Sequence, residues 1–183
     1  MSVLEKMAAA LEERPPVRME PAERHAAVAL MLRERSGGLE LFVIKRAEKS
    51  GDPWSGHMAL PGGRQEPGDK DAYDTARRET LEEVGIDLNE GRFLGWLDDV
   101  GPRRALGQLV VSTVVVAIDA EPGHLDPREV VEAFWVPVDL LVDEHVEIPD
   151  FPGSWPAFTY EDRYVIWGLT HRILTQLWAL IPT

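Results

Sequence analysis

The chain has 183 residues, no cysteine and a formal net charge of −13 at pH 7. This length suits one medium domain with a core of its own. The acidic charge argues against a nucleic-acid polymer as partner, because such binding draws its affinity from clustered Lys and Arg. The lack of cysteine excludes disulfides, thiolate zinc sites and cysteine nucleophiles. The acidic charge is compatible with small anionic ligands, since an acidic protein can hold phosphate through a bound cation and local arginines.

The N-terminal stretch predicts a short helical arm over residues 1–20, ahead of a single domain over 21–183. Its sequence, "MSVLEKMAAALEERPP", carries charges at positions 5, 6, 12 and 13 and therefore lacks the apolar run of a signal peptide. The prolines at 15 and 16 end the helix. Later apolar runs are too short or too interrupted to cross a bilayer. We therefore expect a cytoplasmic protein with no membrane partner.

The first half of the domain predicts a hairpin followed by a helix. Two β-rich runs, 25–33 and 40–46, flank "RSGG". A loop and the short strand-like "ALPGG" come next. From Asp71 the pattern becomes helical, and the helix predicted over 72–84 stops at Gly85, a residue type suited to the position after a helix.

The second half predicts more strands and a C-terminal helix. Strand-like runs cover 93–100 and 109–118, and a third begins at 130 and leads into a short helix after Pro137. Apolar residues at 166, 169, 173, 177 and 181 predict a helix from 162 to 181. Strands alternating with two main helices predict an α/β or α+β domain.

The helix over 72–84 gathers three carboxylates. At about 100° per residue, Glu79, Glu82 and Glu83 share an arc of roughly 100° beside the apolar face. Each neighbouring pair of like charges would cost on the order of 3 kcal/mol at an effective dielectric of ~20. One arginine cannot neutralise all three, whereas a divalent cation can, and hard oxygen ligands favour Mg²⁺ or Mn²⁺. For an isolated run of this kind, the alternative is a solvated acidic face.

The sequence "LPGGRQEPGD" places two glycines directly after a strand, where the backbone bends sharply or approaches another group closely. Alone, it could be a plain turn. Together with the carboxylate helix it resembles the signature of the Nudix (MutT-like) hydrolase family, G-x5-E-x7-R-E-U-x-E-E-x-G-U, where U is apolar. The second half of that signature is matched by Arg78, Glu79, Glu82, Glu83, Gly85 and Ile86, with Thr80 at an apolar position. In the first half, Asp69 replaces the early glutamate and the spacing is one residue longer.

Within the family, "PGGRQEPGD" and "TARRE" resemble the form found in coenzyme A pyrophosphatases. The upstream motif of that subgroup is only partly present. Arg46, Ala47, Gly56 and "LPGG" match it, but its second arginine is missing, Val43 replaces a threonine and one residue is inserted. Two substrate classes therefore remain open: coenzyme A, and another nucleoside diphosphate derivative such as ADP-ribose or a dinucleotide.

The resemblance implies an α/β/α sandwich with a mixed β-sheet, and hydrolysis of a pyrophosphate bond by attacking water. By position, Glu79, Glu82 and Glu83 would ligate Mg²⁺ or Mn²⁺ with the carbonyl oxygen of Gly63. Glu79, Glu83 and Arg78 would be catalytic. Arg78 and Asp69 would brace the carboxylates.

The general base and the substrate contacts stay open at this stage. Glu79 is one candidate base, and an acid on a distant loop, Glu129 or Glu161, is the other. Arg46 and Arg64 are candidates for binding substrate phosphate, with a plain surface role as the alternative. We expect packing roles for His57, and for Trp54 and Trp155, although either tryptophan could stack on a base.

Two other functions share this fold. A nucleotide sensor without catalysis typically loses glutamates of the signature, and all three are present here. Isopentenyl diphosphate isomerases of the common type rely on a cysteine, which this chain lacks. The sequence leaves the oligomeric state open, and a homodimer is one arrangement compatible with it.

Overall fold

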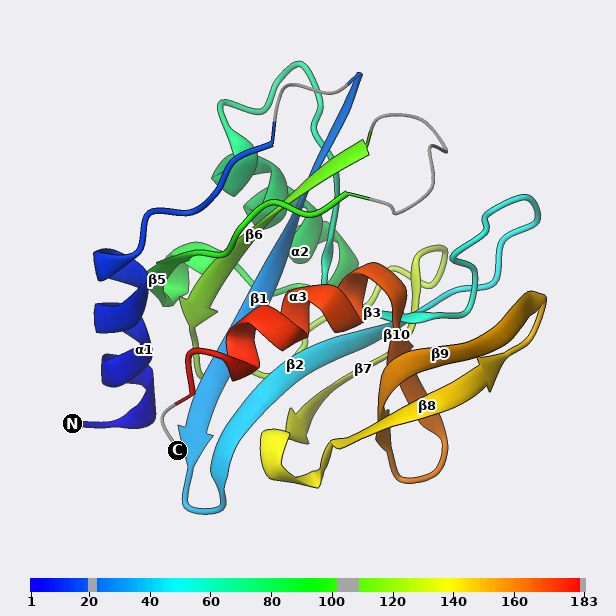
Figure 1. Cartoon of the computed structure of the whole chain (residues 1–183). Coiled ribbons are helices and arrows are strands. Elements are labelled where there is room, and N and C mark those ends of the chain that lie inside the picture. The colour runs from blue at the N-terminus through cyan, green and yellow to red at the C-terminus, as the bar shows by residue number, and fades with distance from the viewer. Residues whose placement is uncertain (20–22, 102–108, 182–183) are drawn as a thin grey trace.

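A computed structural model describes residues 1–19, 23–101 and 109–181, and its centre is a seven-stranded sheet (Figure 1). Its strands are β1 (Arg24–Arg35), β2 (Gly38–Arg46), β3 (Met58–Ala59), β4 (Gly62–Arg64), β5 (Arg92–Trp96), β6 (Leu109–Ala117) and β7 (Val130–Pro137). The main order is β3-β2-β1-β6-β5, with β4 paired to β1 and β7 paired to β2. β1 runs parallel to β6 and the other pairs are antiparallel. The sheet is therefore mixed, as predicted.

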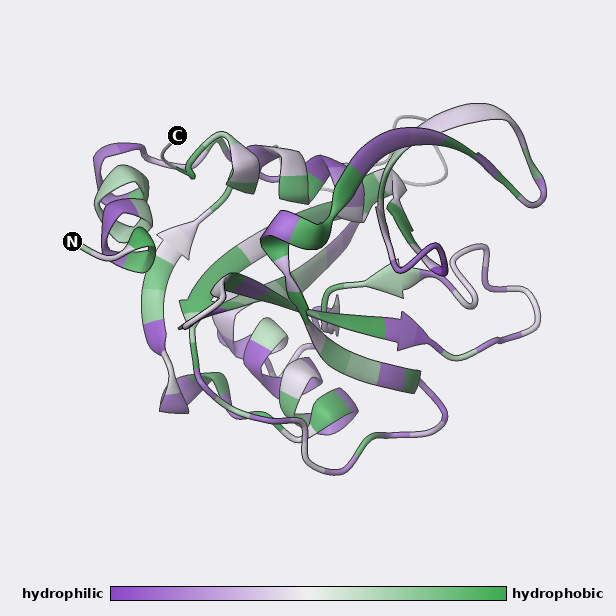
Figure 2. Ribbon diagram, turned by 90° about the horizontal axis from the view of Figure 1, so that it is seen from below, coloured by the Kyte–Doolittle hydropathy of each residue, from purple (hydrophilic) through white to green (hydrophobic). Residues whose placement is uncertain are grey.

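The helices are α1 (Val3–Glu13), α2 (Ala72–Val84) and α3 (Gly168–Trp178), and two short 3-10 turns are η1 (Leu88–Glu90) and η2 (Val138–Leu140). Because side chains alternate along a strand, β1 serves two cores. Ala27, Ala29 and Met31 belong to the core that α2 joins, and Leu30 and Leu32 to the core that α1 and α3 join. Figure 2 shows the hydrophobic residues concentrated on the central strands between the helices. The predicted α/β/α sandwich is confirmed.

The hairpin of β1 and β2, the helix over 72–84, the strand over 130–137 and the turn after Pro137 all match the sequence predictions. The predicted start of the last helix is wrong. Residues 164–167 form β10 (Tyr164–Trp167), and α3 begins only at Gly168, whose φ of 64° changes the chain direction. Pairing of Val165 with Thr159 and of Ile166 with Phe158 outweighs the helical spacing.

β10 belongs to a second, three-stranded antiparallel sheet, which the sequence analysis did not foresee. Its other strands are β8 (Val142–Ile148) and β9 (Phe151–Tyr160), in the order β10-β9-β8. β8 is mostly exposed and carries many charged residues, so it lacks the apolar alternation that identifies a strand. This hairpin projects from one side of the main sheet (Figure 1).

Helix α1 packs on the domain through Met7 and Leu11, which are both buried. Its first backbone N–H groups donate to the carboxylate of Glu34 at the end of β1, and a capping box of Ser2 and Glu5 satisfies its N-terminus. Leu11 also lies over Gly95, where an added Cβ would be 2.7 Å from the leucine Cβ. Among the described helices, none is long and apolar enough to cross a bilayer.

Candidate active site

Helix α2 is fixed at both ends by its own sequence. The Asp71 side chain accepts a hydrogen bond from the backbone N–H of Asp74, 2.8 Å away, and Gly85 ends the helix with a φ of 70°. Thr80 is fully buried at a position where the family signature has an apolar residue. Its hydroxyl donates to the carbonyl oxygen of Ala76 at 2.6 Å, so the buried polar group is satisfied. The helix therefore presents its carboxylates in a fixed register.

The two glycines before α2 meet different constraints. At Gly62 an added Cβ would lie 2.3 Å from the carbonyl oxygen of Ala27, and φ is 154°. At Gly63 it would lie 2.4 Å from the carboxyl carbon of Glu79. The close approach inferred from sequence is thus real, and at Gly63 the group approached is a carboxylate of α2.

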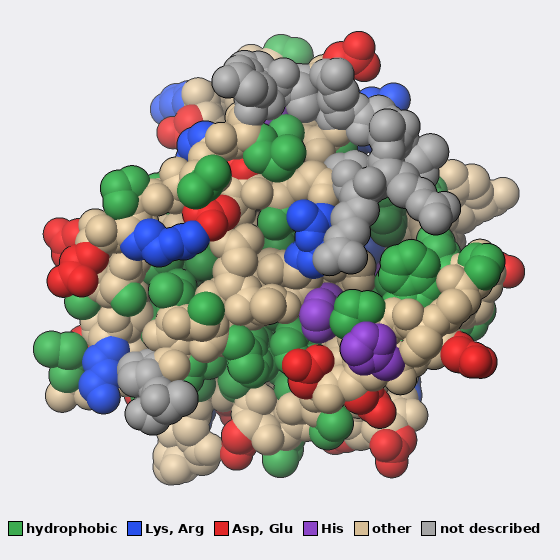
Figure 3. Space-filling view, viewed as in Figure 1, with side chains coloured by type: hydrophobic (Ala, Val, Ile, Leu, Met, Phe, Trp, Pro, Cys, Tyr) green, Lys and Arg blue, Asp and Glu red, His purple; other side chains and the backbone are tan. Residues whose placement is uncertain are grey.

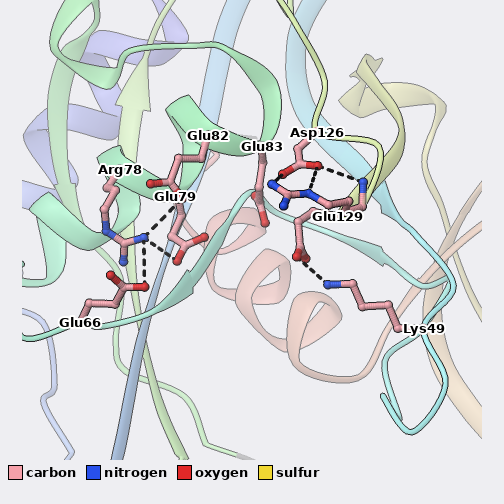
Figure 4. Close-up of a pocket in the computed structure, with 9 residues that line it drawn as sticks. Lys49, Glu66, Arg78, Glu79, Glu82, Glu83, Asp126 and Glu129 are labelled. Atoms are coloured by element: carbon pink, nitrogen blue, oxygen red, sulfur yellow. Dashed lines mark hydrogen bonds and ion pairs between the residues drawn. The ribbon is translucent and has the colours of Figure 1, made fainter.

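The carboxylates of α2 share one cavity of about 540 Å³ (Figure 4). Glu83 lies between Glu79 and Glu129 there, and is only 4% exposed. One of its oxygens accepts the backbone N–H of Gly62 at 3.0 Å. Burial raises the pKa of Glu83 to about 8. A carboxylate held in this way favours a nearby cation.

Glu79 and Glu82 differ from Glu83 in exposure. Burial also raises the pKa of Glu79, although Arg78 donates to it at 2.9 Å. The Glu82 side chain is 59% exposed and 3.5 Å from a nitrogen of Arg78. Among the described residues, no three His, Cys, Asp or Glu side chains form a ready metal-binding group. Holding a cation between three of these side chains would therefore require them to move closer together.

Arg78 links the loop after β4 to the helix. Its Nε and Nη2 donate to the two carboxylate oxygens of Asp69 at 2.8 and 2.9 Å, and Nη2 also reaches the carbonyl oxygen of Arg64. Hydrogen bonds from Arg78 hold the pKa of Asp69 well below its usual range. Thr75 donates to the same carboxylate at 2.9 Å. The structure thus brings Asp69, Arg78 and Glu79 into one hydrogen-bonded network.

Of the candidate bases on distant loops, the structure places only Glu129 in this cavity. Lys49 contacts it at 2.5 Å, and both residues lie in loops flanking the carboxylates of α2. Glu161 lies in the turn between β9 and β10 and lines neither this cavity nor the cleft beside it. Proximity therefore favours Glu79 and Glu129 as base candidates.

A cleft of about 1410 Å³ opens beside the carboxylates on the α3 side of the sheet, and Glu79 and Glu83 reach its wall. The cleft is lined by five residues singled out from the sequence, namely Arg46, Trp54, His57, Arg64 and Trp155. Figure 3 shows hydrophobic and histidine side chains gathered on the face between α3 and β8.

The cleft residues singled out from sequence have distinct environments. Arg46 contacts Asp52 at 2.9 Å, while its buried Nε has no hydrogen-bond partner among the described residues. The side chain of Arg64 is exposed. His57 packs edge-on against Trp167, at 5.2 Å between ring centroids, which fits the expected packing role.

Sequence reasoning missed several residues that line the cleft. Phe151 is the first residue of β9 and Trp167 is the last residue of β10, and their rings contact each other at 4.7 Å between centroids. Trp155 joins them at 5.7 Å from Trp167. Arg24, the first residue of β1, was also missed. No local spacing identifies these residues, because the elements that bring them together are far apart in the chain.

The sequence of this chain is similar to those of Nudix proteins from other organisms. Mitochondrial coenzyme A diphosphatase NUDT8 of Homo sapiens is 33% identical over 175 residues, covering 87% of this chain and 69% of that protein. Nudix hydrolase 22, chloroplastic, of Arabidopsis thaliana is 31% identical over 176 residues, covering 90% and 57%. Two of the curated relatives are much longer than this chain, which spans 34% and 57% of their length.

A solved structure supports the fold. The Nudix hydrolase RenU of M. smegmatis superposes with a TM-score of 0.55 and 21% identity, covering 87% of this chain and 88% of that one. Residues 23–155 match the family model of the NUDIX domain. The chain therefore belongs to the Nudix hydrolase family.

Proposed function

We propose that this chain uses Mg²⁺ or Mn²⁺ to hydrolyse the diphosphate of a nucleoside diphosphate derivative, with coenzyme A as the substrate. One observation carries the proposal. Glu79, Glu82, Glu83 and Glu129 line a single cavity beside the Gly62–Gly63 turn, and that cavity adjoins a cleft large enough for an extended nucleotide.

The chemistry of the donors fits a hard divalent cation. Carboxylate and carbonyl oxygens are the ligands that Mg²⁺ and Mn²⁺ prefer. The residues that would hold the cation are Glu79, Glu82 and Glu83, with the carbonyl oxygen of Gly63. Burial disfavours the charged form of Glu83, so a cation there would offset a cost that the protein otherwise bears. When bound, the cation supplies charge neutralisation at the diphosphate and lowers the pKa of a bound water.

The protein side chains then orient the reaction. A water oxygen attacks one phosphorus of the diphosphate, the bond from that phosphorus to the bridging oxygen breaks, and the bridging oxygen leaves with the other phosphate. Glu79 or Glu129 accepts the proton of the attacking water. Arg78, fixed by Asp69, positions Glu79 for this role. Arg46 lines the cleft beside Asp52 and is the candidate to contact substrate phosphate.

Coenzyme A is favoured over the other substrates by two features. The glycine-rich segment and "TARRE" resemble the coenzyme A subgroup, and a relative covering most of the chain is named a coenzyme A diphosphatase. The cleft also has an apolar end, formed by Phe151, Trp155 and Trp167, that suits a long uncharged arm. ADP-ribose or a dinucleotide is the alternative, because the upstream motif of the subgroup is incomplete.

A panel of substrates tests this proposal. The protein is incubated with each compound in the presence of Mg²⁺, of Mn²⁺ or of chelator, and the products are separated. The compounds are coenzyme A, ADP-ribose, NADH, diadenosine polyphosphates and oxidised dNTPs. We expect metal-dependent conversion of coenzyme A to adenosine 3′,5′-bisphosphate and phosphopantetheine. Turnover of ADP-ribose with coenzyme A untouched would replace the substrate but keep the reaction class. Nucleotide binding without any cleavage would favour a sensor.

A further inference from the structure

Two arginines in the cleft, Arg24 and Arg64, have no acidic partner among the described residues. Most described arginines of this acidic chain make ion pairs, including Arg33, Arg77 and Arg78. Within the described part of the chain, no carboxylate lies within ion-pairing distance of Arg24 or Arg64, and neither guanidinium has a hydrogen-bonded partner. Both side chains are exposed, and both line the cleft.

The strand register places these two arginines on the same face. In the antiparallel pairing of β1 with β4, Ala26 stands opposite Arg64. Arg24 is two residues from Ala26, so it is the diagonal neighbour of Arg64, with side chains roughly 7–8 Å apart at their bases. Two guanidinium groups at that separation can reach the same anion.

The register also sets this pair apart from the carboxylate cavity. Gly63 approaches Glu79 of α2, whereas Arg24 and Arg64 line the cleft but not the cavity of the carboxylates. The two arginines thus lie beside the cleavage site, on the other face of the strand.

Several other described charges along the cleft have partners, and Arg172 donates to the carbonyl oxygen of Gly101. Asp52 pairs with Arg46, and Asp98 and Asp99 pair with Arg14 and Arg18 from the segment after α1. Among the described residues outside the group around Glu79, Glu83 and Glu129, Arg24 and Arg64 therefore carry positive charge that no carboxylate neutralises. In a chain of net charge −13, such positive charge favours an anion bound there.

We propose that Arg24 and Arg64 form a second anion subsite, which binds a phosphate on the ribose of the substrate, separate from the diphosphate that is cleaved. This inference rests on the proposed function, because it assumes a nucleotide in the cleft. The subsite selects substrates carrying a 3′-phosphate over those with a free ribose hydroxyl. Arg24 and Arg64 are specificity residues and take no part in bond cleavage.

Coenzyme A and dephospho-coenzyme A differ only in that phosphate, so they test the subsite directly. The ratio of their kcat/KM values is measured for the wild type, Arg24→Ala, Arg64→Ala and Arg24→Lys. Arg92→Ala is the matched control, because Arg92 is an exposed arginine of β5 that does not line the cleft. We expect the wild type to prefer coenzyme A, and each alanine variant to lose about tenfold of that preference. The lysine variant should keep part of it, and Arg92→Ala all of it.

An equal loss for both substrates would place the arginines at the diphosphate and overturn the subsite. An unchanged preference in Arg24→Ala and Arg64→Ala would also overturn it. Binding of adenosine 3′,5′-bisphosphate and of AMP, measured by calorimetry, needs no turnover. If neither coenzyme is cleaved, the proposed function fails, and tighter binding of the bisphosphate that weakens in Arg24→Ala would still support the subsite. Equal binding of the two nucleotides would reject it.

Discussion

The two ends of the cleft are built in different ways. At the carboxylate end, Glu79, Glu82 and Glu83 come from one helix, and the glycine turn they face lies within the preceding 25 residues of chain. At the aromatic end, His57 comes from the loop before β3, Phe151 and Trp155 from β9, and Trp167 from the end of β10. The reacting groups are thus local in sequence, while the surface that would select a substrate is assembled from distant segments.

This difference predicts separate consequences for the two ends. Changes at the carboxylate end should lower kcat, because in the proposed reaction those groups act on the breaking bond. Changes at the aromatic end should raise KM and leave kcat nearly unchanged, because those contacts bind substrate and transition state alike.

The largest expected effect is at Glu83. Glu83→Gln removes the charge that would hold the cation but keeps the shape and an acceptor for the Gly62 N–H. We expect kcat to fall by about a thousandfold. The fold should be retained in chelator, because the substitution also removes a buried carboxylate. Turnover and circular dichroism are measured beside Glu90→Gln, an exposed residue of η1 that makes the same change of charge. Near wild-type turnover in Glu83→Gln would remove this residue from the site.

The glycine turn should give the next largest effect. In Gly63→Ala the new methyl group would lie 2.4 Å from the carboxyl carbon of Glu79 and push that side chain away. We expect kcat to fall by about a hundredfold, because catalytic groups tolerate little displacement. Gly37→Ala is the control, since an added Cβ at Gly37 meets no atom within 4 Å. A crystal structure of Gly63→Ala with Glu79 unmoved would contradict this reading of the turn.

The pairing of Asp69 with Arg78 should matter both for activity and for stability. Asp69→Asn weakens the two bonds that fix Arg78, and we expect about a thirtyfold loss of kcat. At pH 7 the variant should also lose about 2 kcal/mol of unfolding free energy.

The stability difference should depend on pH. Hydrogen bonds from Arg78 hold the pKa of Asp69 below its unfolded value of about 4. A group with a depressed pKa stabilises the fold above that unfolded value, and this contribution is lost as the pH falls towards the folded value. The free energies of unfolding of the wild type and Asp69→Asn, measured in urea, should therefore begin to approach each other as the pH falls below about 4. A pH-independent difference would mean that the charge on Asp69 contributes nothing.

The aromatic end should give the smallest effect on the reaction. Phe151→Leu removes the ring that contacts Trp167. We expect the KM for coenzyme A to rise about fivefold, with kcat within twofold of the wild type. Phe93→Leu is the control, because Phe93 is 51% exposed and lies on β5, outside the cleft. A large fall in kcat for Phe151→Leu would contradict the separation of kcat effects at the carboxylate end from KM effects at the aromatic end.

The sequence predicts most of the main sheet, the helix over 72–84 and the glycine turn, because each depends on local spacing. The approach of Gly63 to Glu79 follows from the same local logic, since only a glycine allows it. The sequence does not predict β8 to β10, because β8 is largely exposed and β10 has an apolar spacing that also fits a helix. Arg24 and Trp167 enter the cleft through the pairing of β1 and β10 with their neighbouring strands, which no motif encodes.

The most direct test of the central claim is cation binding at the carboxylate end. Free Mn²⁺ is followed by electron paramagnetic resonance as it is titrated with the wild type, Glu83→Gln and Glu90→Gln. The account predicts that the wild type and Glu90→Gln bind Mn²⁺, that Mg²⁺ displaces it, and that Glu83→Gln binds it at least tenfold more weakly. Equal Mn²⁺ binding by all three proteins would contradict the claim that Glu83 helps to hold the cation.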